Sequence, residues 1–198
     1  MEQLIIAVLV LSSVVSLTFI IERGLALRWR KVIPPDVEVA VENCFAPDDA
    51  PGLRRVCAAH PSALSTLVTT AMDHLEAPME ETKDAIETRA RHEITRLERG
   101  LVVLEIATGI APLMGLVGTI YGLIKLFNAL GDKGLTDNSA FASGIAVALN
   151  ATLLGLLVAI PSLIAWSYYS RKVETFAVEM ETICDELLRR LNRRKKSS

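Results

Sequence analysis

Two threonines lie within long apolar segments that hold few other polar side chains. Thr119 belongs to APLMGLVGTIYGLIKLF, residues 111–127, and Thr152 belongs to GIAVALNATLLGLLVAIPSLIAW, residues 144–166. A hydroxyl group both donates and accepts hydrogen bonds, and hydroxyl and amide oxygens also suit a hard cation. Asn150 supplies such an amide close to Thr152. The alternative is that each threonine hydroxyl bonds to the backbone of its own helix.

Small residues surround both threonines at helical spacing. In the first segment and its flank, residues at spacings of four, three, four and three share one helix face. These residues are Thr108, Pro112, Gly115, Thr119 and Gly122. In the second segment a similar face is formed by Gly144, Ala148, Ala151, Gly155, Ala159 and Ser162, with Thr152 at its edge. Two such faces can pack closely against each other, or several copies can surround a central object.

Three uncharged segments predict three membrane-spanning helices. Residues 4–21 run for 18 positions without a charge, residues 106–124 for 19 and residues 139–170 for 32. A helix of about 20 apolar residues crosses a bilayer core. The predicted elements are a first transmembrane helix over 1–22, a second over 101–130, a connecting loop over 131–138 and a third transmembrane helix over 139–170.

Basic residues flank one end of each predicted span. Arg23, Arg28, Arg30 and Lys31 follow the first, Arg96 and Arg99 precede the second, and Arg171 and Lys172 follow the third. Because Lys and Arg beside a span tend to remain in the cytoplasm, these positions predict an N-out, C-in topology. A cleaved signal peptide is disfavoured, since its first region should be basic and here carries only Glu2.

The polar sequence, residues 23–100 and 171–198, is predicted to form cytoplasmic helices. DVEVAVENCF and SALSTLVTTAMDHL are typical of short amphipathic helices separated by proline-containing breaks. From Met79 to Arg99 there is no proline or glycine, so we expect one long helix that continues directly into the second span. Apolar residues keep a helical rhythm over 173–191 and precede a basic tail.

Composition and motifs argue against nucleic-acid binding, a metal site and catalysis. The net charge of −2 gives no electrostatic bias toward nucleic acid. Cys44, Cys57 and Cys184 fit no zinc pattern and, on the predicted cytoplasmic side, are expected to be free thiols. The sequence has no Gly-rich phosphate loop, no GxSxG and no His/Glu pair at ligand spacing on a helix. We therefore expect no enzymatic activity, no cofactor and no metal.

The two apolar segments resemble the MotA/TolQ/ExbB proton-channel family, most closely its ExbB and TolQ branch. The resemblance rests on APLMGLVGTIYGLIKLF and GIAVALNATLLGLLVAIP, and it covers the last two predicted spans. It implies an all-α protein of the bacterial inner membrane, in which long second and third helices extend into the cytoplasm and 131–138 is a periplasmic loop. It also implies a homopentamer around a central pore.

The resemblance further implies partners and a task. A dimer of a single-span ExbD/TolR-like protein would sit in the pore and carry a membrane aspartate that takes up and releases protons. A TonB-like protein is a further candidate partner, and membrane lipids surround the assembly. The complex would couple the proton motive force to outer-membrane transport or envelope maintenance.

Carried onto this sequence, the resemblance gives candidate ion-pathway residues. Thr119 and Thr152 match the family's pore-facing threonines, whose hydroxyls can serve the partner's carboxylate or its water. The full candidate set for the pore lining is Thr119, Thr152, Thr108, Gly115, Gly122, Ala148 and Gly155.

Three positions are candidate modulators, and two of them, Val147 and Lys125, depart from the family pattern. The branch usually reads GIAEAL, whereas this sequence reads GIAVAL, so Val147 stands in place of a glutamate. Asn150, one turn on, is polar but does not titrate. Lys125 stands where an uncharged polar residue is more usual, and it either biases ion entry or snorkels to the interface. Beside a proton-driven motor, a non-conducting pentameric scaffold and a sodium-coupled motor therefore remain open.

Overall fold

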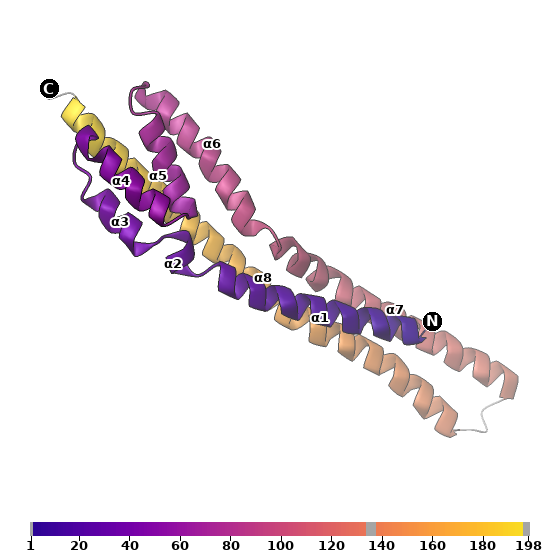
Figure 1. Ribbon diagram of the computed structural model, residues 1–198. Coiled ribbons are helices and arrows are strands. Elements are labelled where there is room, and N and C mark those ends of the chain that lie inside the picture. The colour runs from indigo at the N-terminus through magenta and orange to yellow at the C-terminus, as the bar shows by residue number, and fades with distance from the viewer. Residues whose placement is uncertain (1, 134–137, 196–198) are drawn as a thin grey trace. The chain divides into compact units, whose positions relative to one another are not determined.

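The computed structural model describes residues 2–133 and 138–195, and the regular structure of this part is entirely helical (Figure 1). This confirms the all-α prediction. In chain order the helices are α1 (Glu2–Ala26), α2 (Trp29–Val32), α3 (Pro35–Glu42), the 3-10 helix η1 (Pro47–Asp49), α4 (Ala50–Ala59), α5 (Ala63–Asp73), α6 (Met79–Glu98), α7 (Leu101–Lys133) and α8 (Asn138–Lys195).

Three of these helices are long and apolar enough to cross a membrane, as the sequence predicts. The apolar stretches are Gln3–Ala26 in α1, Leu101–Asn128 in α7 and Gly144–Asn192 in α8. At 58 residues, α8 joins the predicted third span and the predicted C-terminal helix in one continuous helix. At 1.5 Å per residue its length is about 87 Å, well beyond a bilayer core.

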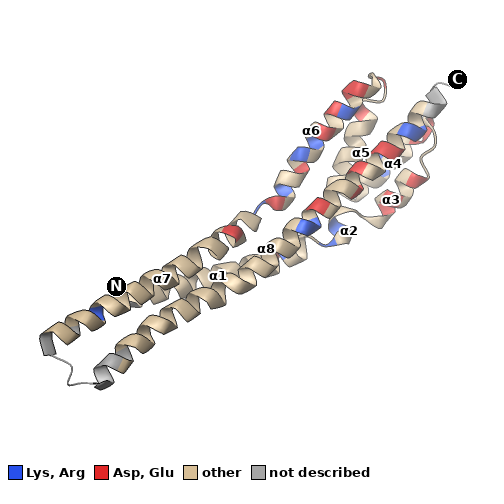
Figure 2. Ribbon diagram, turned by 180° about the vertical axis from the view of Figure 1, so that it is seen from behind, with Lys and Arg blue, Asp and Glu red and all other residues tan. Residues whose placement is uncertain are grey.

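The chain divides into two compact units. The first, here called the membrane unit, contains Met1–Arg23 and Gly100–Tyr168. The second, the polar unit, contains Gly24–Arg99 and Tyr169–Ser198. Figure 2 shows that charged residues gather on the helices of the polar unit and are sparse along α1, α7 and the first part of α8.

In the membrane unit, α1 packs against α7 and the first part of α8. Its core contains Ile5, Leu9, Ala111, Val158 and Ala159. Large apolar side chains also point outward, with Leu11 at 64%, Leu113 at 61% and Ile164 at 65% exposure. An apolar exterior over an apolar core is what a membrane-embedded bundle requires, because lipid replaces water around it.

The prediction of one continuous helix from Met79 into the second span is wrong, because the helix is interrupted once. Helix α6 ends at Glu98 and α7 begins at Leu101. Between them Gly100 has a φ of +91°, a backbone conformation that glycine adopts far more readily than other residues. Glycine just beyond a helix end is a common stop signal, and a single glycine is enough to end the helix after a stretch that contains neither proline nor glycine.

The polar unit is built around α5 and the second part of α8. The apolar rhythm predicted for the tail is confirmed, since Val173, Phe176, Met180 and Leu187 are all at most 1% exposed. Both short helices predicted from the sequence are present as α3 and α5. Helix α4 is not among the predicted helices, because one of the proline-containing breaks extends to Pro51. In the structure Pro51 lies in the first turn of the helix, where proline is tolerated.

Candidate functional site

The structure brings the two candidate threonines together. Thr119 on α7 and Thr152 on α8 share a hydrogen bond between their Oγ1 atoms. The Thr119 hydroxyl also lies 3.0 Å from the carbonyl oxygen of Ala148 and 3.2 Å from that of Gly115. The Thr152 hydroxyl lies 3.4 Å from the same Gly115 oxygen. Each hydroxyl has one proton to donate, so these contacts are alternatives and the pair can rearrange its hydrogen bonds.

Glycine is required where α7 and α8 approach each other. A β-carbon added at Gly155 would lie 2.6 Å from the carbonyl oxygen of Ala111 and 3.2 Å from the Cα of Gly115. One added at Gly122 would lie 3.0 Å from the Cβ of Ala148. Within one chain, the small-residue faces therefore pack against each other, and Gly115, Gly122, Ala148 and Gly155 are buried in that contact.

Sequence reasoning missed one glycine in this contact. A β-carbon at Gly118 would lie 2.5 Å from the Cβ of Ala151 and 3.5 Å from the Cγ2 of Ile5 on α1. Gly118 is three residues after Gly115 and four before Gly122, so the same helical spacing could have identified it.

Thr108 is not joined to the threonine pair by a recorded hydrogen bond. It is half-buried on α7 and donates to the carbonyl oxygen of Leu104 at 2.9 Å. For Thr108 the structure therefore shows the alternative named for the threonines in the sequence analysis, a hydroxyl bonded to the backbone of its own helix.

Val147 and Asn150 line a small cavity of about 130 Å³ in the membrane unit. The described residues around it are Ile5, Ile6, Gly118, Tyr121, Gly122, Val147, Asn150, Ala151 and Leu154. None of them is acidic, so the polar groups of this lining are the Tyr121 phenol, the Asn150 amide and the backbone. Val147 is half-buried and Asn150 is exposed.

Lys125 lies next to this lining. Its ammonium group is 5.2 Å from the centre of the Tyr121 ring, which is the distance of a cation–π contact. The side chain is exposed. An aromatic face supports a cation that would otherwise be poorly solvated near the end of a membrane span.

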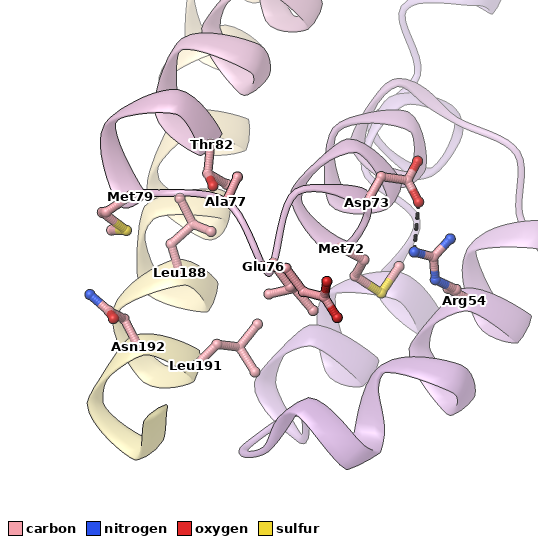
Figure 3. Close-up of a pocket in the computed structure, with 11 residues that line it drawn as sticks. Arg54, Met72, Asp73, Glu76, Ala77, Met79, Thr82, Leu188, Leu191 and Asn192 are labelled. Carbon is pink, nitrogen blue, oxygen red and sulfur yellow. Dashed lines mark ion pairs between the residues drawn. The ribbon is translucent and has the colours of Figure 1, made fainter. Parts of the chain in front are cut away.

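The polar unit holds a larger cavity of about 540 Å³, drawn in Figure 3. Met72, Leu188 and Leu191 give it an apolar wall, and Arg54 pairs with Asp73 at 2.6 Å on its rim. Both partners are about half exposed, at 46% and 50%, so the pair contributes little to stability. Histidine, cysteine and serine are absent from the described lining residues, so this cavity offers no nucleophile paired with a histidine base.

The cysteines are free and buried. Desolvation by burial raises the pKa of the Cys44 and Cys57 thiols, and these thiols are therefore neutral near pH 7. A neutral thiol is a poor nucleophile and metal ligand. Across the described residues, no group of three or more His, Cys, Asp or Glu side chains could hold a metal ion.

Comparison with known protein families finds a match for this chain. The sequence profile of the MotA/TolQ/ExbB proton channel family matches residues 59–182, which is more than half of the chain. The match contains the whole of α7 and the part of α8 that carries Thr152.

Similar proteins carry ExbB and TolQ names. The Tol-Pal system protein TolQ of Pseudomonas aeruginosa is 29% identical over 97% of this chain and 88% of its own length. A putative biopolymer transport protein, ExbB-like 1 of Synechocystis sp., is 33% identical over 90% of this chain and 74% of its own. The biopolymer transport protein ExbB of Aquifex aeolicus is 38% identical over 46% of this chain, and this alignment spans 61% of that protein.

Proposed function

Because the chain belongs to the MotA/TolQ/ExbB proton channel family, we propose that it is an ExbB/TolQ-like subunit of a proton-driven motor in the bacterial inner membrane. Five copies, oriented N-out and C-in, would surround a dimer of an ExbD/TolR-like protein with a membrane aspartate. The complex would couple the proton motive force to outer-membrane transport or envelope maintenance, and a TonB-like protein would be a further partner.

The hydroxyl pair of Thr119 and Thr152 carries this proposal. It forms a polar cluster with the carbonyl oxygens of Gly115 and Ala148 inside two apolar helices. The hydroxyls have alternative acceptors, so one can turn toward a partner carboxylate or its water while the other keeps its bond to the protein. Thr108 would extend the same pathway along α7.

The small residues have a supporting role in this proposal. Gly115, Gly122, Ala148 and Gly155 bring α7 and α8 close enough for the two hydroxyls to meet. They would thereby fix the wall of the pathway. Val147, Asn150 and Lys125 would modulate ion entry, since they line or border the adjoining cavity.

Paired substitutions at the threonines test the hydroxyl chemistry. Thr119→Val and Thr152→Val keep the side-chain shape and remove the hydroxyl, whereas Thr119→Ser and Thr152→Ser keep the hydroxyl. The matched control is Thr18→Val on α1, because the Thr18 hydroxyl donates to its own helix at Val14, at 2.8 Å. The assay measures proton flux through the complex with its native partner in vesicles, together with the native mass of the complex.

We expect proton flux to fall at least tenfold in each valine variant, while the native mass of the complex still fits five copies of this chain and two partner chains. The serine variants and Thr18→Val should retain most of the flux. Full flux in both valine variants would refute the hydroxyl role. A mass that fits another copy number would refute the pentamer.

Two further functions have specific support. Val147 places an apolar side chain in the cavity lining, which favours a non-conducting scaffold. The hydroxyls and the exposed Asn150 amide favour a sodium-coupled motor, because hard cations bind neutral oxygens. A complex that assembles without any ion flux identifies the scaffold, and flux that requires a sodium gradient identifies the sodium motor.

A further inference from the structure

Helix α2 and the residue that precedes it, Arg28, present four exposed residues between buried anchors. Arg28, Trp29, Arg30 and Lys31 are exposed, and Trp29 retains 42% of its surface. They are held between Leu27 on one side and Val32 with Ile33 on the other, all of which are at most 3% exposed. We call the four exposed residues the α2 surface.

Backbone hydrogen bonds and a ring contact fix this surface. The Lys31 amide donates to the Arg28 carbonyl oxygen at 2.9 Å, and the Ile33 amide donates to that of Trp29 at 2.8 Å. The Trp29 ring lies 5.2 Å from the ring of Phe176, at an angle of 50°, and Phe176 is fully buried. The aromatic and the cations are therefore presented by an ordered segment, not by a loose tail.

The charge of the α2 surface is unbalanced. None of its three cations forms an ion pair with a carboxylate in the described part of the chain. The apolar stretch of α1 ends at Ala26, two residues before Arg28. Basic residues this soon after a span are typical of the lipid-headgroup region, where tryptophan also accumulates.

We propose that the α2 surface is a binding site for the headgroup of an anionic phospholipid. The cations of Arg28, Arg30 and Lys31 bind the phosphate, and the exposed side of Trp29 lies along the adjoining glycerol and acyl region. A lipid is favoured over an acidic protein segment because the surface directly follows a membrane span. The proposal depends on the membrane-spanning fold and is independent of ion conduction.

Tryptophan fluorescence can test this directly. The chain has two tryptophans, Trp29 and Trp166, so a Trp166→Phe parent reports on Trp29 alone. The full chain is placed in nanodiscs with equal amounts of phosphatidylglycerol and phosphatidylcholine. In one set the phosphatidylglycerol is brominated, and in the other the phosphatidylcholine. Both sets have the same overall charge, so any difference in quenching reports which lipid lies beside Trp29.

We expect at least twofold stronger quenching of the parent by brominated phosphatidylglycerol. A basic residue near the surface concentrates an anionic headgroup by about fivefold. In the triple variant Arg28→Gln, Arg30→Gln, Lys31→Gln the two lipids should quench equally. The conservative variant Arg28→Lys, Arg30→Lys should keep the preference.

The charge-matched control is Arg55→Gln, Arg91→Gln, Arg189→Gln, which removes three exposed cations elsewhere in the polar unit. The proposal is overturned if both brominated lipids quench the parent equally. It is also overturned if the control variant loses the preference for phosphatidylglycerol as fully as the triple variant does. Equal quenching by both lipids, combined with a Trp29 emission shift on adding polyglutamate, would identify an acidic protein partner instead. Should the triple variant fail to fold, the three single Gln variants should each lower the preference stepwise.

Discussion

Replacement of Gly155 by alanine tests whether the contact between α7 and α8 is as close as the structure shows. The new β-carbon would lie 2.6 Å from the carbonyl oxygen of Ala111 and 3.2 Å from the Cα of Gly115. Ordinary contact needs at least 3.4 Å, so the helices must separate by several tenths of an ångström. The obstacle is backbone and cannot rotate away. Overpacking of this kind costs about 1–3 kcal/mol.

The matched control is Gly109→Ala on α7, because a β-carbon at Gly109 would meet nothing within 4 Å. Both variants gain the same helix propensity, about 1 kcal/mol, so their difference isolates the contact. Thermal unfolding of the full chain in nanodiscs should place Gly155→Ala roughly 3–9 °C below Gly109→Ala, at about 3 °C per kcal/mol. Equal melting temperatures would refute the close packing of these helices.

Three further substitutions or modifications probe other parts of the structure. Gly100→Ala should lower the free energy of unfolding by about 1–2 kcal/mol, because the backbone there has a φ of +91° and the new β-carbon would lie 3.1 Å from the Nε of Arg23. Unchanged stability in thermal unfolding would contradict that geometry. At pH 7.5 the free energy of unfolding of Val147→Glu should be about 2 kcal/mol lower than that of the isosteric Val147→Gln, because the charge enters a mainly apolar cavity lining. Equal free energies would show that water reaches the cavity. Because burial raises the pKa of Cys44 and Cys57, iodoacetamide should label these thiols at pH 7 more than tenfold more slowly in the folded chain than in the unfolded chain, and labelling should become faster as the pH rises past 9. Rapid labelling of the folded chain at pH 7, measured by mass spectrometry, would show exposed thiolates.

The three spans and the meeting of α7 with α8 were predictable from the sequence. Uncharged runs set the spans, because a charge inside a bilayer is costly. The spacing of small residues predicted that the faces bearing Thr119 and Gly155 could pack closely. The sequence does not show whether these faces pack against each other within one chain or surround a central object in several copies, because both arrangements use the same residue spacing. The contact of Gly155 with Ala111 shows that the first occurs within the chain.

Other features depended on competing local signals. The absence of proline and glycine from Met79 to Arg99 favours a continuous helix, and Gly100 favours an end, but the sequence alone does not say which signal is stronger. Pro51 shows the opposite error, because a proline that breaks a helix interior also starts a helix well. The hydrogen bond between Thr119 and Thr152 could not be predicted, since it depends on the depth at which two distant segments meet.

The side chains at the centre of the spans limit what this subunit can do alone. A hydroxyl can pass a proton along a hydrogen bond, but it does not hold a charge near neutral pH, so it cannot store the proton between steps. The uncharged runs 106–124 and 139–170 contain no Asp, Glu, His, Lys or Arg. With Val147 in the cavity lining, the proposed proton-driven cycle would use a carboxylate from another chain. Thr119 and Thr152, which have alternative acceptors, would then position that carboxylate and pass its proton, and this division of labour would make the partner essential to the proposed mechanism.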